Sequence, residues 1–357
     1  MEDQTEQALL ENFAAAVAEA TGSALPMPEA SGDPRADFVV HTHIQDRPIR
    51  FVLEAKRSLF PRDAREAAWQ LRNYLAHQLQ PDLRETVPVL IAETISPGAR
   101  KLLREERIGY FDASGSLFLA TQGFYVRIDK PGSKRQARSL NNLFAGKRAQ
   151  ALHAVWIVGQ DWFGVHEIAE RASVSPATAS ETLIALERRE WVESRGAGPS
   201  KERRLTNRHA LLDAWSGHQS AVKPKPMRHY YVRGTTTGEL QPELDRVCAA
   251  HGVLYEISGV AAGQIHTPYL SSVSQVTCRM SGGGPINTVL ETLEARPVRE
   301  GWNLGVVEAK SDGELRFHQR VNDLWVSDPL QTYLDLVQTG GRAKELAQHL
   351  RAERLEA

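Results

Sequence analysis

The sequence of 357 residues contains little cysteine and no long apolar run. Cys248 and Cys278 are its two cysteines, and this pair forms neither a disulfide framework nor a zinc-ligand pattern. No stretch of about 18 apolar residues occurs, so no membrane-spanning helix is expected. The first residues, MEDQ, are acidic and lack the basic-then-apolar plan of a secretory signal. These absences predict a cytoplasmic protein with reduced thiols and no membrane partner.

Charge is unevenly distributed along the chain, although the net charge is only −1. Residues 129–228 contain 17 Lys and Arg against 10 Asp and Glu, a net charge of +7. The segments before and after this one each have a net charge of −4. A length of 357 residues exceeds the usual size of one hydrophobic core and predicts several domains. The basic middle segment favours binding to nucleic-acid phosphates, and a solvated basic face is the alternative.

The basic segment contains two short helical patterns separated by a tight break. Residues 165–172 repeat small apolar side chains at helical spacing. Ser175 then suits an N-cap and Pro176 suits the first position of the next helix. A glycine-rich turn and a basic arm at residues 201–205 follow. This order resembles the winged helix-turn-helix family, whereas an ordinary helical hairpin with a loop is the other interpretation.

The resemblance implies that the second helix enters the major groove of double-stranded DNA with its N-terminal end. Thr178, Ser180 and Glu181 are expected to face the bases, and none of them makes the bidentate contacts of Arg, Asn or Gln. The phosphate contacts are expected from the basic hairpin, through Arg195, Lys201, Arg203 and Arg204. Weak readout by one copy predicts a homodimer on an inverted-repeat operator, with DNA shape as the alternative source of specificity.

The first 128 residues alternate helical and strand patterns, which predicts an α/β domain. The expected helices cover residues 6–20 and 63–78, with a third capped by Ser96 and Pro97. The expected strands cover residues 37–42, 49–56, 87–92, 109–112 and 116–120.

Several polar residues of this domain are spaced so that they share one face of an expected strand or helix. Glu54 and Lys56 are two apart on one expected strand and therefore share a face, while Asp37 begins the preceding strand. Gln70 and Tyr74 are four apart on the following helix and share a helical face. This combination resembles the PD-(D/E)xK nuclease superfamily, and Gln70-x-x-x-Tyr74 is similar to the motif of its RecB-like branch.

The nuclease resemblance implies Mg²⁺-dependent hydrolysis of DNA. Asp37 and Glu54, with the backbone carbonyl that follows Glu54, would hold Mg²⁺ through oxygen ligands. Lys56 would orient the attacking water and stabilise the phosphate, while Gln70 and Tyr74 would support the site or touch the DNA. A further carboxylate from the first helix, Glu6 or Glu11, is a third possible ligand. Whether catalysis is retained stays open at this point.

Two polar linkers divide the chain into predicted domains. The predicted boundaries are a nuclease-like domain at 1–128, a basic linker at 129–146, a winged helix at 147–218, a proline-containing linker at 219–228 and a C-terminal α+β domain at 229–357. Within the last domain, a hairpin is expected from residues 305–309 and 315–317, turning at Asp312 and Gly313.

The C-terminal third ends in the sequence VSDPLQTYLDLVQTGGRAKELAQHL at residues 326–350. Together with the preceding winged helix, this ending resembles the AbiEi-type antitoxin and transcriptional-regulator family of type IV toxin–antitoxin systems, over residues 147–351. The resemblance implies a nucleotidyltransferase-like C-terminal domain without catalytic residues, and no cofactor-binding residue is predicted there. It also implies a cognate toxin or another defence protein as a partner.

Three functions are therefore predicted. The leading hypothesis is a DNA-binding transcriptional regulator of AbiEi type with an attached nuclease-like domain. The alternative is a Mg²⁺-dependent DNA endonuclease of the PD-(D/E)xK class that the winged helix delivers to DNA. A third is a protein whose C-terminal domain mainly holds a partner protein.

Overall fold

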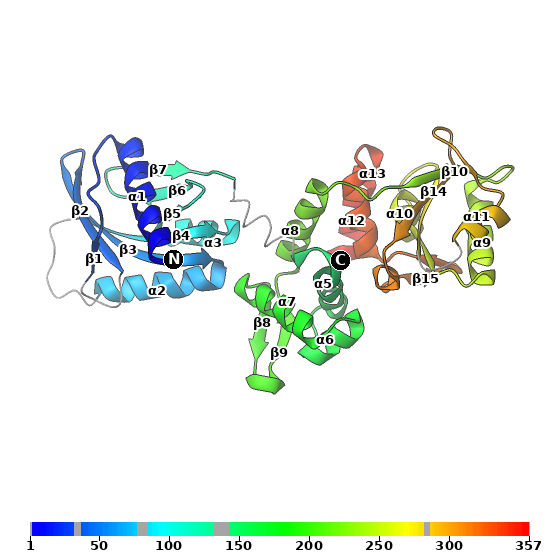
Figure 1. Cartoon of the computed structure of the whole chain (residues 1–357), viewed down its shortest axis with the longest axis horizontal. Helices are drawn as coiled ribbons and strands as arrows, with labels where there is room; N and C mark the ends of the chain where they lie inside the picture. The colour runs from blue at the N-terminus through cyan, green and yellow to red at the C-terminus, as the bar shows by residue number, and fades with distance from the viewer. Residues whose placement is uncertain (1, 32–36, 77–84, 132–142, 282–285, 357) are drawn as a thin grey trace. The chain divides into compact units, whose positions relative to one another are not determined.

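A computed structural model describes residues 2–31, 37–76, 85–131, 143–281 and 286–356, and it has a mixed α/β architecture (Figure 1). Its elements separate into two compact units. Unit 1 contains residues 1–143, 160–165 and 180–206, and unit 2 contains residues 144–159, 166–179 and 207–357. Compactness thus assigns the elements of residues 147–218 to both units, and the domain boundaries expected from the sequence stay a prediction. Most of the linker expected at 129–146 lies outside the described residues.

Unit 1 is built around a sheet whose described strands lie side by side in chain order. These strands are β1 (Glu29–Ala30), β2 (Phe38–Ile44), β3 (Arg47–Leu59), β4 (Glu85–Ile95), β5 (Gly109–Asp112), β6 (Leu117–Ala120) and β7 (Tyr125–Ile128). Strand β4 runs parallel to both β3 and β5, whereas the other neighbours are antiparallel.

Helices cover the two faces of this sheet separately. Helix α1 (Glu2–Thr21) buries its apolar side chains against one face, in a cluster that includes Leu53. Helices α2 (Pro61–Ala76) and α3 (Pro97–Glu105) bury theirs against the other face, in a cluster that includes Val52. Because strand side chains alternate, Glu54 and Lys56 share the face of Val52 and point toward α2.

A two-residue turn sets the register between β2 and β3. Gln45 and Asp46 both adopt positive φ, the conformation that a tight type I′ hairpin requires. The resulting register pairs Phe38 with Leu53, so Asp37, one residue earlier, bonds to the backbone of β3 on both sides of Glu54, at Leu53 and Ala55. A local turn therefore positions two predicted site residues next to each other.

The middle of the chain forms the expected helix, turn, helix and hairpin. The elements are α5 (Gly146–Val158), α6 (Val165–Ala172), α7 (Pro176–Arg188), β8 (Val192–Arg195), β9 (Glu202–Leu205) and α8 (Arg208–Ala221). The predicted cap is confirmed, because the Thr178 backbone N–H donates to Ser175 Oγ at 3.2 Å. Helix α7 ends at Arg188, because Glu190 takes a positive φ and the Trp191 N–H turns back to donate to the Leu186 carbonyl.

Unit 2 contains a second, mixed sheet with the described strand order β13-β10-β14-β12-β11-β16-β15. The strands are β10 (Arg228–Tyr231), β11 (Tyr255–Ser258), β12 (Val276–Ser281), β13 (Arg296–Pro297), β14 (Leu304–Ala309), β15 (Gln319–Val321) and β16 (Leu324–Val326). The expected hairpin after residue 309 is wrong. Strand β14 lies between β10 and β12, so both of its edges are occupied, and residues 312–315 form a short 3₁₀ helix instead.

The helices after β10 are α9 (Thr237–Ala250), α10 (Gly259–His266), α11 (Ile286–Thr292), α12 (Pro329–Thr339) and α13 (Arg342–Leu350). Helices α9, α10 and α11 bury apolar side chains in the core cluster of this sheet. Asp328 caps α12, because its Oδ1 accepts from the Gln331 N–H at 3.0 Å. In the described chain, no helix is both long enough and apolar enough to cross a lipid bilayer.

Candidate metal and nucleic-acid sites

The structure brings Asp37, Glu54 and Lys56 together at one end of β2 and β3. The Asp37 N–H donates to the Leu53 carbonyl at 3.0 Å, and Asp37 Oδ2 accepts from the Ala55 N–H at 2.7 Å. Lys56 Nζ lies 2.6 Å from Glu54 Oε1. We call this arrangement the Glu54 site.

Glu54 is the buried member of the site and has an unused oxygen. The residue is 4% exposed, whereas the side chain of Lys56 is 42% exposed. Glu54 Oε2 has no hydrogen-bond partner among the described residues. Burial raises the pKa of Glu54; the contact with Lys56 opposes this rise, and the charges of Asp37 and Glu66 add to it. A cation bound at Oε2 would offset the cost of holding the charged form of Glu54 in this buried, acidic place.

Helix α2 brings Glu66 to the site, which the sequence analysis did not anticipate. The helix runs back along β3, since its start lies near the end of that strand while the Tyr74 hydroxyl accepts from Arg50 Nη2 at 3.1 Å. Arg50 precedes Glu54 by four strand residues, or about 13 Å. Tyr74 therefore lies away from the carboxylates, and Gln70 is exposed between the two ends.

The sequence could have indicated Glu66, because this residue precedes Gln70 by four positions and therefore shares its helical face. The other proposed ligands, Glu6 and Glu11, lie on α1 and not on α2. Helix α1 covers the sheet face opposite to the one that carries Glu54. A ligand from α1 therefore stays a prediction, and the helical carboxylate whose charge acts on Glu54 is Glu66.

The residues present fit a largely hydrated Mg²⁺ and do not form an all-protein cage. Among the described residues, no group of three or more His, Cys, Asp or Glu is arranged to hold a metal. Asp37 and Glu54 offer two carboxylates, one of them with an unpartnered oxygen. Mg²⁺ commonly keeps several waters and uses one or two carboxylates together with substrate phosphates.

The N-terminal end of α7 presents the residues predicted to read DNA. Glu181 is exposed there, while Thr178 and Ser180 are half-buried. Ala179 and Leu183 are buried and pack the other side of the helix. The same capped helix therefore has one packed face and one accessible face at its first turn.

The four predicted hairpin cations all meet carboxylates. Lys201 Nζ and Arg203 Nε each lie 2.8 Å from Glu187 Oε1. Arg195 Nη2 lies 2.7 Å from Glu202, and Arg204 pairs with Glu193. Arg203 is only 5% exposed, so it is withdrawn from the predicted phosphate contacts. Its burial follows from its position in β9, where its side chain points inward to Glu187.

Glu187 organises this region and was missed in the sequence. This residue of α7 is buried. Its carboxylate accepts hydrogen bonds from Lys201, which directly precedes β9, and from Arg203 within β9. Burial raises the pKa of Glu187, but the hydrogen bonds from the two cations outweigh that effect and hold the pKa below its ordinary value. A charged Glu187 thus fixes the hairpin to the helix.

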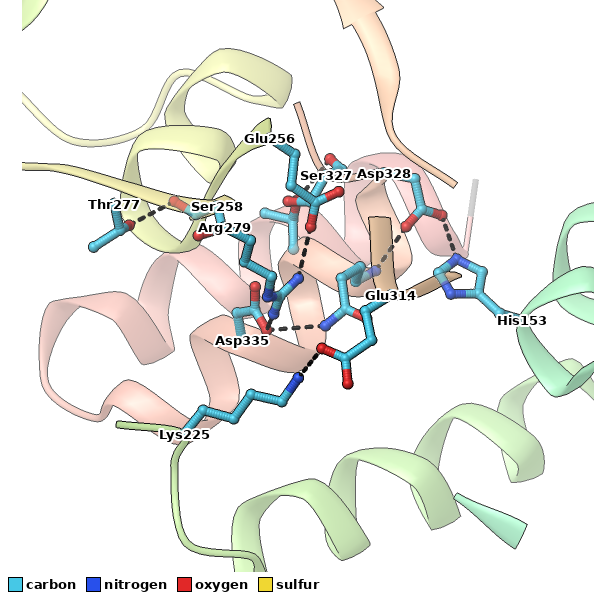
Figure 2. A network of polar contacts seen from close by, with 12 residues as sticks. His153, Lys225, Glu256, Ser258, Thr277, Arg279, Glu314, Ser327, Asp328 and Asp335 are labelled. Atoms are coloured by element: carbon cyan, nitrogen blue, oxygen red, sulfur yellow. Dashed lines mark hydrogen bonds and ion pairs between the residues drawn. The ribbon is translucent and has the colours of Figure 1, made fainter. Parts of the chain in front are cut away.

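Unit 2 contains a separate buried cluster of polar side chains (Figure 2). Glu256 on β11 and Arg279 on β12 are register partners in the sheet. Arg279 Nη1 donates to Glu256 Oε1 at 2.8 Å, and its Nη2 donates to Asp335 of α12. Gln331 Nε2 also donates to Asp335, at 2.9 Å. One guanidinium therefore joins two strands and a helix.

The cluster holds two carboxylates with one arginine. Burial raises the pKa of Glu256 to about 7, against the lowering effect of Arg279. The charges of Asp335 and Glu256 raise the pKa of Arg279 despite its burial, so Arg279 stays charged. A single positive charge neutralises only one carboxylate, so burial and the neighbouring carboxylates favour the protonated form of Glu256.

A third carboxylate, Asp328, acts on Glu256 of this cluster. The nearby Asp328 is also occupied, since it caps α12 and its Oδ2 lies 2.9 Å from His153 Nε2. His153 stacks on Phe317 with ring centroids 4.3 Å apart. Although Asp335 Oδ2 has no hydrogen-bond partner among the described residues, each of these buried charged groups is paired through at least one atom, which fits a structural role.

The chain matches no protein-family model, and neither the curated proteins nor the solved structures contain a match to it. The functional argument therefore rests on the geometry of these sites.

Proposed function

We propose that this protein is a DNA-binding transcriptional regulator of the AbiEi-antitoxin type, with a winged helix-turn-helix and a nuclease-like domain. The observation that carries the proposal is α7, whose capped first turn presents Thr178, Ser180 and Glu181 while its other face is packed. A helix with an accessible N-terminal turn, preceded by a second short helix, is the arrangement that enters a major groove.

The hairpin supports this proposal as the source of phosphate contacts. Arg195 and Arg204 both lie over the indole of Trp162, at 4.2 and 5.0 Å from the ring centroid. Their partners Glu202 and Glu193 lie on the same hairpin and are themselves partly exposed. Phosphates would therefore compete with weak, exposed ion pairs and not with buried ones.

Footprinting on the protein's own promoter tests the proposal. The expected result is protection of two half-sites about one helical turn apart, bound by a homodimer. Glu181→Ala should alter base preference with unchanged salt dependence, because Glu181 would contact a base. Glu167→Ala provides a control, since Glu167 is exposed on the preceding helix. Absence of protection, or a single half-site bound tightly by a monomer, would contradict the proposal.

The proposal includes a protein partner for unit 2, either a cognate toxin or another defence component. Co-purification with the product of a neighbouring gene tests this part separately. Failure of the two proteins to associate would remove the antitoxin assignment and leave DNA binding intact.

The second candidate is a Mg²⁺-dependent endonuclease of the PD-(D/E)xK class, which the unpartnered, buried Glu54 Oε2 favours. When bound, Mg²⁺ would polarise the scissile phosphate. Asp37 and Glu54 would hold it, and Lys56 would orient the attacking water and offset the charge that develops on the phosphate. The 2.6 Å contact of the exposed Lys56 ammonium with Glu54 Oε1 supports this proposal.

A cleavage assay with Mg²⁺ or Mn²⁺ distinguishes the two functions. The endonuclease predicts loss of duplex DNA that Lys56→Ala abolishes. Arg57→Ala is a matched control, because Arg57 is the next exposed cation on β3 and alternation directs it to the opposite face. Tight operator binding without cleavage would exclude the endonuclease and support only the regulator.

A further inference from the structure

Within unit 1, the C-terminal end of α7 is joined to α2 by charged side chains. Arg65 of α2 donates from Nε and Nη2 to the two carboxylate oxygens of Glu190, each at 3.1 Å. Arg188 Nη2 donates to Asp63 Oδ2 at 2.8 Å and to Ser58 Oγ at 3.0 Å. We call this set of five residues the α7–α2 contact.

Aromatic packing reinforces the contact. The guanidinium groups of Arg188 and Arg189 lie 4.7 and 4.4 Å from the ring centroid of Phe60. Arg189 is buried, and this burial lowers its pKa to about 10. A desolvated cation over an aromatic face is among the stronger arrangements of this type. The contact therefore combines a bidentate ion pair with a partly dehydrated centre.

The contact meets both elements that build the Glu54 site. Ser58 follows Lys56 by two residues and shares its face of β3. Asp63 precedes Glu66 by three residues on α2, and its Oδ2 also accepts from the Phe60 N–H at 3.1 Å. Arg188 thus touches the strand and the helix that carry the carboxylates, although it belongs to the helix predicted to read DNA.

We propose that the α7–α2 contact couples DNA binding at α7 to divalent-cation binding at the Glu54 site. The inference rests on both functions proposed above. Because Arg188 contacts both β3 and α2, a cation that fixes these two elements at the Glu54 site also fixes the end of α7, and a duplex that fixes α7 acts on the site in return. Each ligand then strengthens binding of the other by the same factor.

The test measures the dissociation constant of a fluorescein-labelled promoter duplex with and without Ca²⁺, at constant ionic strength. Ca²⁺ is used because it takes oxygen ligands as Mg²⁺ does. The wild-type protein should bind the duplex at least about 5-fold more tightly with Ca²⁺. Free divalent ions by themselves weaken protein–DNA binding through counterion competition, so tightening identifies coupling.

Three variants separate the contact from its surroundings. Glu190→Arg opposes Arg65 and should abolish the tightening, and Arg65→Glu combined with Glu190→Arg should restore it. Glu167→Arg is the control, because it changes the charge equally and its side chain is 39% exposed against 38% for Glu190. This control breaks only a pair within α6, with Arg171, and should keep the wild-type tightening.

Glu54→Gln should abolish the effect of Ca²⁺, because it removes a carboxylate ligand of the cation. The inference is overturned if Glu190→Arg retains the tightening, if Glu54→Gln retains it, or if the wild type shows none. The cation-free dissociation constant reports DNA binding independently, so failure of the coupling and failure of the proposed function give different results. Thermal unfolding of each variant verifies that it is folded.

Discussion

Glu54 in unit 1 and Glu256 in unit 2 make an instructive comparison, since both are buried strand glutamates beside one cation. Glu54 meets the flexible, exposed Lys56 and retains an oxygen without a partner. Glu256 meets the buried Arg279, whose other terminal nitrogen is taken by Asp335. The Glu54 arrangement faces an exposed lysine and is open to a further cation. The Glu256 arrangement is closed around a buried arginine, although Asp335 Oδ2 also lacks a hydrogen-bond partner among the described residues.

The difference teaches that the type and burial of the cation decide what a buried carboxylate does. A lysine on a flexible stem offers a point charge that can turn toward solvent or a phosphate. An arginine offers a rigid fork that binds two acceptors at fixed angles. Asp37 and Glu66 also leave the Glu54 site acidic, while Arg279 neutralises one of the two carboxylates in its own cluster.

Arg279→Met should break the closed arrangement with the largest effect. The variant leaves Glu256 and Asp335 buried without their cation, which should lower the free energy of unfolding by about 3–5 kcal/mol. Chemical denaturation measures the loss. Arg246→Met is the control, because Arg246 is exposed and pairs with Glu243 on the same helix. Equal stability of the two variants would show that Arg279 does not support the cluster.

The pH dependence of stability should reveal Glu256 itself. Its folded-state pKa of about 7 lies above the ordinary value of 4.5, so its stabilising contribution is complete below about pH 4.5. That contribution is lost as the pH rises through about 7, and it amounts to at most about 3 kcal/mol. The free energy of unfolding of the wild type, relative to Glu256→Gln, should therefore fall over this window. A constant difference would contradict the assignment.

Glu54→Gln should change the free energy of unfolding in the opposite direction from Arg279→Met. Removing a buried charge with an unpartnered oxygen should raise the stability of the cation-free protein by about 1 kcal/mol, despite the lost pair with Lys56. Added Mg²⁺ should raise the melting temperature of the wild type only, because ligand binding stabilises the folded state. Equal Mg²⁺-induced shifts in both proteins would place the cation elsewhere.

The hairpin offers a smaller comparison of the same kind, between buried Arg203 and half-exposed Arg204. Arg204→Ala should weaken binding to all duplexes similarly and reduce the salt-dependence slope by about one unit. Arg203→Ala should leave that slope unchanged and lower stability instead, because it removes a donor from buried Glu187. Anisotropy titrations at several salt concentrations provide the measurement. Equal slopes for both variants would contradict the distinction.

Local patterns in the sequence determined much of the architecture. Helical spacing and the Ser175 cap place α6 and α7, and strand alternation puts Glu54 and Lys56 on one face. The cap at Ser96 was likewise predictable, since its Oγ accepts from the Ala99 N–H. These features depend on residues two to four positions apart, and their physical causes are therefore present in any short stretch of chain.

Only the tertiary structure decided which charged side chains contact one another. The direction of α2 along β3 brings Glu66 to Glu54 and takes Tyr74 to Arg50. The fold of the hairpin against α7 buries Arg203 on Glu187, sixteen residues earlier. No local rule specifies these partners, because a donor is satisfied by whichever acceptor packing brings within about 3 Å, and that acceptor comes from a distant part of the chain.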